Sequence, residues 1–117
     1  MKLENKKVAI LATDGFEKSE LFEPLKALKN EGAEVHIIST KDGEIRSWDK
    51  TDWGESIKVD KKIETTVESD YHSLVLPGGV INPDNLRTNE AALDFIRAFF
   101  KSGKPVAAIC HAPWLLI

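Results

Sequence analysis

The strongest constraint on the fold is an N-terminal strand–helix–strand pattern with short connections. Residues 7–13 and 34–40 are two apolar runs of strand length. Between them, residues 19–31 place leucines on one helical face, at Leu21, Leu25 and Leu28. Such a unit predicts two parallel strands of one sheet joined by a right-handed crossover helix, so we expect an α/β fold.

The second half of the chain continues this alternation. Ser73–Leu76 and residues 105–109 predict a third and a fourth parallel strand, the fourth buried. A helix is predicted over residues 90–102, with its apolar face at Leu93, Ile96, Phe99 and Phe100. Residues 41–61 are polar and predict one or two short antiparallel strands, with inward side chains at Ile45, Ile57 and Val59.

Composition narrows the class of protein. With 42% hydrophobic residues, the 117-residue chain is long enough for one domain, residues 1–117, and too short for two. A net charge of −3 without a basic patch, and no apolar run near ~20 residues, predict neither a nucleic-acid nor a membrane partner. One cysteine and no signal peptide indicate the cytoplasm. The apolar ending, Trp114–Ile117, predicts a domain that is incomplete at its C-terminus.

Cys110, the single cysteine, lies between the fourth strand and the opening of a helix. A cysteine on a sharp strand-to-helix turn forms a nucleophile elbow, where the helix N-terminus favours the thiolate. His111 could act as its base if the ring folds back across the turn and a carboxylate orients it. The alternatives are that Cys110 is a small buried hydrophobe, as most free cysteines are, and that His111 caps the helix.

Glycines follow the third strand, at the sheet edge where ligands bind in such folds. After Pro77, the backbone of Gly78 and Gly79 could aim an N–H group at an oxyanion, with the amide of His111 as a second donor. The alternative is a tight turn that only glycine can make. A phosphate loop is excluded because neither of its glycine patterns follows.

Two carboxylates follow the first strand at the same edge. Glu17 and Glu20 share a helix face; Glu17 fits a solvated carboxylate at a helix start, whereas Glu20 would lean toward the sheet edge. Near a thiolate, Glu20 could hold a proton to donate. His36, on the opposite side of the second strand from its neighbours, and His72, in a loop, receive no role. We expect no metal, because zinc needs three or four ligands.

Four segments carry a family resemblance: DGFEKSE at 14–20, LVLPGG at 74–79, PDNLR at 83–87 and GKPVAAICHAP at 103–113. Together they resemble the ThiJ/PfpI family, most closely its PfpI branch of peptidase-like and deglycase proteins. The resemblance implies a flavodoxin-like three-layer sandwich with Cys110 as elbow nucleophile, Glu20 as the carboxyl on its sulfur and Gly79 as oxyanion donor. It implies His111 as the base, oriented by an acid from a neighbouring subunit, for which Asp84 is the matching position.

The resemblance also implies a cysteine-dependent stress-response hydrolase or lyase without a cofactor. Its substrates would be small dicarbonyls, glycated protein or nucleotide amines, or peptides, and it would form a homodimer or a larger homo-oligomer. Trp48 and Trp53 could lie in such a subunit contact or cover a flank of the core. One departure is Ala112, where the family usually has glycine. Two alternatives stay open: a redox-sensing or chaperone-like stress protein whose Cys110 is oxidised, and a glutamine amidotransferase-like domain.

Overall fold

The fold is built around a five-stranded sheet in which all neighbouring strands pair in parallel. The computed structural model describes residues 3–49, 52–78, 86 and 89–108. In sheet order the strands are β6 (Lys61–Lys62), β3 (Glu34–Ser39), β1 (Lys7–Leu11), β7 (Ser73–Leu76) and β8 (Val106–Ala108). The four predicted parallel strands are confirmed, and β7 has the predicted bounds.

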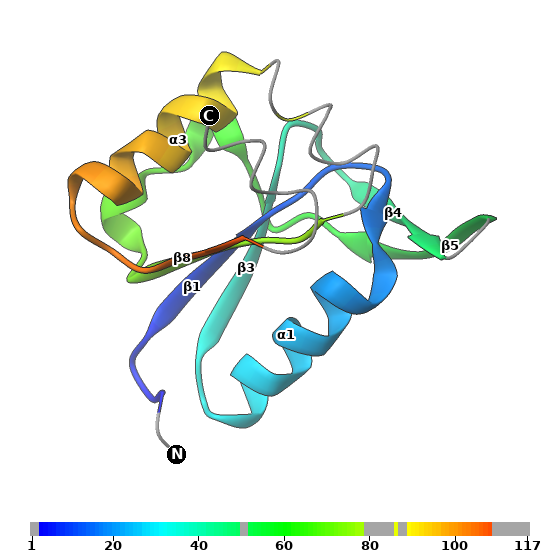
Figure 1. Cartoon of the computed structure of the whole chain (residues 1–117), viewed down its shortest axis with the longest axis horizontal. Coiled ribbons are helices and arrows are strands. Elements are labelled where there is room, and N and C mark those ends of the chain that lie inside the picture. The colour runs from blue at the N-terminus through cyan, green and yellow to red at the C-terminus, as the bar shows by residue number, and fades with distance from the viewer. Residues whose placement is uncertain (1–2, 50–51, 79–85, 87–88, 109–117) are drawn as a thin grey trace.

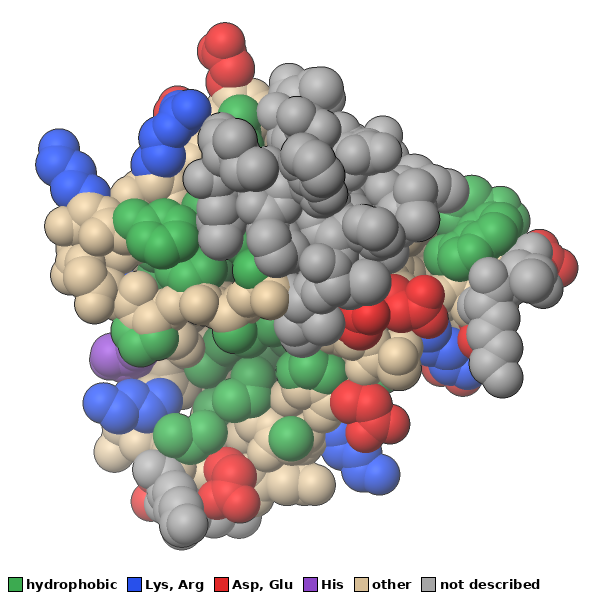
Figure 2. All heavy atoms as spheres, in the orientation of Figure 1, with side chains coloured by type: hydrophobic (Ala, Val, Ile, Leu, Met, Phe, Trp, Pro, Cys, Tyr) green, Lys and Arg blue, Asp and Glu red, His purple; other side chains and the backbone are tan. Residues whose placement is uncertain are grey.

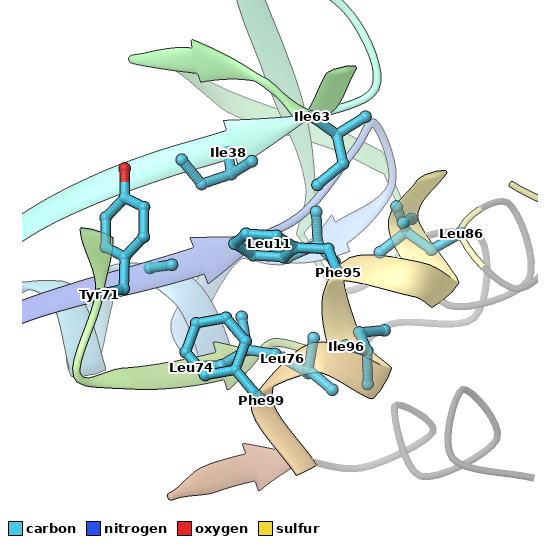
Figure 3. Close-up of a cluster of buried hydrophobic side chains, with 12 residues drawn as sticks. Leu11, Ile38, Ile63, Tyr71, Leu74, Leu76, Leu86, Phe95, Ile96 and Phe99 are labelled. Atoms are coloured by element: carbon cyan, nitrogen blue, oxygen red, sulfur yellow. The ribbon is translucent and has the colours of Figure 1, made fainter. Parts of the chain in front are cut away.

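One helix covers each face of this sheet (Figure 1). α1 (Lys18–Asn30) packs on the face that carries Ile10, and α3 (Glu90–Lys101) packs on the face that carries Leu11. Alternate side chains of β1 therefore enter two different hydrophobic cores. Figure 3 shows the core beneath α3, which contains Tyr71, Leu74, Leu76, Phe95, Ile96 and Phe99. Helix, sheet and helix form the predicted three-layer α/β sandwich.

The turn after α1 sets the path into β3. Gly32 has φ +92°, a left-handed conformation that glycine adopts without a steric penalty. The N–H of Ala33 then donates to the carbonyl of Leu28 at 3.0 Å, which closes the helix end. Gly32 thus ends the crossover helix and directs the chain back along the sheet.

A second, smaller sheet lies beside the first and has the order β2–β4–β5. β2 (Phe16–Glu17) pairs in parallel with β4 (Glu44–Asp49), which forms an antiparallel pair with β5 (Asp52–Lys58). The predicted antiparallel strands are confirmed, with Ile45 and Val59 buried and Ile57 packed against the core. β2, β6 and the 3₁₀ turns η1 (Ile63–Thr65) and η2 (Glu68–Asp70) were not predicted, because two or three residues carry no readable periodicity.

Two burial predictions are wrong. Phe100 is 53% exposed, because the buried stripe of α3 runs through Ala92, Phe95, Ile96 and Phe99 and leaves the next position outside it. Ala107 is exposed rather than buried, since β8 is the outermost strand of the described sheet. Among the described residues, neither helix is long and apolar enough to cross a lipid bilayer.

Candidate active site

The predicted site segments follow strands that end at the same edge of the sheet. β1 and β7 are neighbours, with Ile10 opposite Val75, so the loops after them leave the sheet side by side. β8 runs parallel to β7, with Ala108 opposite Leu76, and therefore carries the chain toward this edge just before Cys110. In an α/β sheet, the carboxyl ends of parallel strands are the usual position of a ligand site.

Glu20 contacts the loop after β7 directly. Its Oε1 accepts a hydrogen bond from the backbone N–H of Gly78 at 2.9 Å, although the two residues are 58 positions apart. The N–H of Glu17 donates in turn to the carbonyl of Gly78 at 3.1 Å. The start of α1 thus holds Gly78 on both its N–H and its carbonyl. The prediction that Glu20 leans toward the sheet edge is confirmed.

Local structure after β1 explains how Glu20 reaches this position. Gly15 has φ +86° and donates its N–H to the carbonyl of Arg46 at 2.9 Å, so the chain reverses sharply after β1. β2 then pairs with β4, and α1 begins immediately after it. Because Glu20 is the third residue of α1, it lies in the first helical turn and faces the end of β7.

The Gly78 hydrogen bond also narrows the choice of oxyanion donors. Since the Gly78 N–H donates to Glu20, we expect Gly79 and His111 rather than Gly78 to offer backbone N–H groups to a substrate. Gly79, Asp84, Cys110 and His111 lie outside the described residues, so their proposed roles stay predictions. Pro77 and Gly78, which precede Gly79, are buried.

The two described histidines lie away from this edge and have other partners. His36 Nδ1 lies 2.8 Å from the hydroxyl of Tyr71, and its Nε2 lies 2.9 Å from a carboxylate oxygen of Glu34. His72 Nδ1 accepts a hydrogen bond from the backbone N–H of Lys7. Burial, reinforced by nearby carboxylates, raises the pKa of Tyr71 to about 12. Within the described ranges, no group of three or more potential ligands could hold a metal ion.

One polar cluster at this edge was not predicted from the sequence. Asp14, three residues beyond the end of β1, accepts hydrogen bonds from the backbone N–H of Arg46 at 2.8 Å and from Lys41 Nζ at 2.9 Å. These residues line a hollow of about 380 Å³ together with Glu44, Trp53 and Ser56. The one sequence feature that pointed to this cluster was the presence of two tryptophans, Trp48 and Trp53, in the polar segment 41–61.

Comparison with known proteins identifies the family. The model of the DJ-1/PfpI family matches residues 6–117. The chain belongs to the DJ-1/PfpI family. This confirms the resemblance drawn from the four motifs, which lie within the matched range.

The relatives include proteins with deglycase names. Over 114 residues the chain is 42% identical to Protein/nucleic acid deglycase 2 of Escherichia coli, covering 97% of this chain and 64% of that protein. It is 41% identical over 111 residues to Deglycase PfpI of Pyrococcus furiosus, covering 95% of this chain and again 64% of the relative. The chain thus spans less than two thirds of these relatives' length.

A solved structure supports the fold independently. The crystal structure of a two-domain protein from Anabaena variabilis, with DJ-1/ThiJ/PfpI-like and ferritin-like domains, superposes with a TM-score of 0.87 at 33% identity. The match covers 96% of this chain and 31% of that protein. The predicted α/β sandwich is therefore confirmed both by the strand order and by this similarity.

Proposed function

We propose that this chain provides the nucleophile of a cysteine-dependent stress-response enzyme that removes dicarbonyl adducts from amines. The observation that carries the proposal is the 2.9 Å hydrogen bond between Gly78 N–H and Glu20 Oε1. It joins two of the predicted site segments at the edge toward which β8 runs before Cys110. The deglycase names of two relatives support this substrate class, and the single cysteine suits a reducing cytoplasm.

The proposed reaction begins when the Cys110 thiolate adds to a carbonyl carbon of the adduct. A C–S bond forms while the carbonyl π electrons move to oxygen, and the N–H groups of Gly79 and His111 stabilise the oxyanion. Glu20 or His111 supplies the proton with which the amine departs. For the aminocarbinol adduct of methylglyoxal, the amine leaves with the C–N electron pair, and its carbon becomes an aldehyde to which the sulfur transfers. A proton shift between the two oxidised carbons turns this hemithioacetal into a thioester, and one water hydrolyses the C–S bond. The products are the free amine, a three-carbon hydroxy acid and the regenerated thiol, and because the oxidation and reduction are internal, no external oxidant or reductant is needed.

A second copy of the chain belongs to the proposal. His111 follows Cys110 directly, and adjacent side chains diverge within a helix, so the histidine needs a separate group to orient its ring. We assign this role to Asp84 of a neighbouring subunit, which makes the active form a homodimer or a larger homo-oligomer. The test of this part is whether subunit dissociation on dilution and loss of activity occur together.

The main test is release of amine from methylglyoxal-modified Nα-acetyl-lysine by the full chain. We expect turnover in the wild type and none in Cys110→Ser. Glu20→Gln should lower kcat/KM at least tenfold, because a glutamine can accept the Gly78 hydrogen bond but cannot carry the proton. Glu23→Gln is the matched control, since Glu23 is an exposed carboxylate on the same helix. Absence of turnover in the wild type, or unchanged turnover in Cys110→Ser, overturns the proposal.

Two other outcomes would identify the alternatives. Cleavage of unmodified peptides without amine release would favour a peptidase. Oxidation of Cys110 by peroxide without turnover would favour a redox sensor. His111→Ala separates an enzyme from a sensor, because a base is needed for turnover and not for oxidation. For an enzyme we expect this variant to lose turnover and to keep the peroxide sensitivity of Cys110.

A further inference from the structure

The hollow beside Asp14 combines an aromatic wall with cationic groups. Trp53 is 39% exposed and packs edge to face against Trp48, with ring centroids 5.3 Å apart. Arg46 and Lys41 line the same hollow of about 380 Å³, together with Ser56 and the carboxylates of Asp14 and Glu44. Figure 2 shows exposed hydrophobic side chains over the β4–β5 hairpin, next to charged ones. An aromatic face beside cations is the combination that binds a flat ring carrying an anion.

The hairpin is shaped to present these groups. Arg46 pairs with Ser56 and Trp48 pairs with Trp53, so β5 has one residue more than β4 between these pairs, which is a β-bulge. Gly54 lies within it, where a Cβ atom would be only 2.7 Å from Ser47 Oγ and 2.9 Å from Asp49 Cβ. Only glycine fits there without a shift of its neighbours. The bulge sets where Trp53 points, as bulges near functional sites commonly do.

The cations are held in place and keep donors for a ligand. Arg46 Nε donates to the carbonyl of Gly54 at 3.2 Å, which fixes the guanidinium, and its two terminal nitrogens have no hydrogen-bond partner among the described residues. In the described part of the chain, no carboxylate lies within ion-pair distance of Arg46. Lys41 donates one hydrogen bond to Asp14 and has two more N–H donors. The Asp14 carboxylate is itself occupied by Lys41 and by the Arg46 N–H.

Backbone pairing connects this hollow to the candidate active site. Gly78 O accepts from Glu17 N, Glu17 pairs with Trp48, and Trp48 pairs with Trp53. Three lateral steps of about 4.8 Å each place Trp53 about 14 Å from Gly78. This is roughly the length of four residues of extended chain, at about 3.4 Å each, and is within reach of a substrate that reacts beside Gly78.

We propose that Trp53, Arg46 and Lys41 form a specificity subsite for a part of the substrate remote from its reacting amine, and that its ligand is a flat ring carrying an anionic group. This inference rests on the proposed function only in calling the ligand a substrate. The binding itself does not depend on that function. A nucleotide, which carries a base and a sugar phosphate, and an aromatic amino acid with a free carboxylate share this chemistry. Trp53 stacks on the ring, and the Arg46 fork with Lys41 binds the anion.

The test is an NMR titration of the indole N–H signal of Trp53, assigned by its loss in Trp53→Phe. The probes are guanosine monophosphate and N-acetyltyrosine, each a ring with an anion, compared with guanosine and inorganic phosphate, each with one element only. We expect at least one ring-bearing anion to bind, and guanosine and phosphate to bind at least tenfold more weakly. Binding of guanosine monophosphate would identify a nucleotide as the ligand, and binding of N-acetyltyrosine would identify an aromatic amino acid.

Variants separate recognition from folding. Arg46→Gln should weaken the ring-bearing anion about tenfold and leave guanosine unchanged, whereas Trp53→Ala should weaken both about tenfold. Arg97→Gln, an exposed guanidinium on α3, is the matched control and should change nothing. The coupled circular-dichroism signal of the Trp48–Trp53 pair checks that the hairpin is intact in the Arg46 variants. Should Arg46→Gln disturb that signal, Arg46→Lys, which keeps the charge but not the fork, should bind the ring-bearing anion more tightly than Arg46→Gln and more weakly than the wild type.

The result is independent of turnover, because the titration is repeated in Cys110→Ser, where we expect the same affinities. Binding in a protein that shows no turnover would support the subsite and reject the proposed function. Turnover without a shift of the Trp53 signal, or equal affinities in wild type and Arg46→Gln with an intact hairpin, would overturn the subsite.

Discussion

The two edges of the five-stranded sheet both hold hydrogen bonds between distant segments, but those bonds join different groups. We call the edge where the parallel strands begin the amino edge, and the edge where they end the carboxyl edge. Near the amino edge, His36 connects the side chains of Glu34 and Tyr71, and Tyr71 is only 2% exposed. At the carboxyl edge, Glu20 binds the backbone N–H of Gly78.

This difference separates stability from chemistry. At the amino edge, polar side chains satisfy one another against a packed aromatic core, so we expect their loss to destabilise the fold. At the carboxyl edge, a carboxyl group lies against the loop that precedes Gly79, so we expect its loss to change reactivity and leave the fold almost unchanged. Substitutions at both edges, compared by unfolding and by reactivity, can break or sharpen this contrast.

The largest expected effect is that of Tyr71→Ala. The Tyr71 ring is buried and packs edge to face against Phe95, with ring centroids 6.4 Å apart. Its removal leaves a cavity in the core beneath α3, which should lower the free energy of unfolding by about 3–5 kcal/mol. Urea unfolding followed by circular dichroism measures this. A loss under about 1 kcal/mol would show that the amino edge is not a stability element.

Tyr71→Phe should produce a smaller effect, whose pH-dependent part appears at high pH. The pKa of Tyr71 is raised from 10.0 to about 12 in the folded chain, so the unfolded chain loses the phenolic proton first as pH rises. The corresponding stability is fully present below pH 10 and is lost between about pH 10 and 12. By linkage this amounts to about 2–3 kcal/mol, which Tyr71→Phe should not lose.

The measurement is the free energy of unfolding of both proteins at several pH values through this window. Lysine deprotonation affects both chains alike, so the difference between them isolates the hydroxyl group. At neutral pH the variant should be less stable by about 1 kcal/mol, since it lacks the hydrogen bond to His36. Parallel pH profiles would contradict the assignment.

Glu68→Gln should have a smaller effect, in the acid range. The hydrogen bond and charge of Lys104, helped by Ser102 and opposed by burial, lower the pKa of Glu68 below 4.5. Glu68 also accepts from Lys104 at its backbone carbonyl, and so joins η2 to the turn before β8. A lowered pKa contributes stability above the unfolded value, and this is lost as pH falls through the folded value.

We therefore expect the free energy of unfolding of Glu68→Gln to fall less steeply with decreasing pH than that of the wild type. The change should be smaller than either change at Tyr71, because the pair lies near the surface. Asp94→Gln is the control, since it removes an exposed helix ion pair on the same side of the sheet. An equal response in both variants would mean that the contact between Glu68 and Lys104 adds no more to stability than an exposed ion pair does.

The sequence predicted most of the sheet, because its strands are long enough to show an apolar pattern. It predicted the carboxyl edge for a related reason: parallel strands end together, so segments after β1 and β7 must meet. It could not predict that Glu20 binds Gly78 N–H, nor that His36 meets Tyr71, because both contacts depend on the register between strands. β2 was missed although it positions α1, since a two-residue strand has no periodicity.

The smallest effect on stability, and the sharpest test of the contrast, is expected for Glu20→Gln. The glutamine side chain can still accept the Gly78 hydrogen bond, so the free energy of unfolding should change by less than about 0.5 kcal/mol.

Reactivity should change much more if Cys110 lies beside this carboxyl. The measurement is the pH dependence of Cys110 alkylation by iodoacetamide, compared with the midpoint near ~8.5 of a free thiol. In the wild type we expect a rate that is already flat near neutral pH, and a clear shift of this profile in Glu20→Gln but none in Glu23→Gln. A wild-type midpoint at the free-thiol value, unaffected by Glu20, would mean that the carboxyl edge of this chain holds no assembled site. A large loss of stability in Glu20→Gln would instead mean that Glu20, like Tyr71, serves the fold.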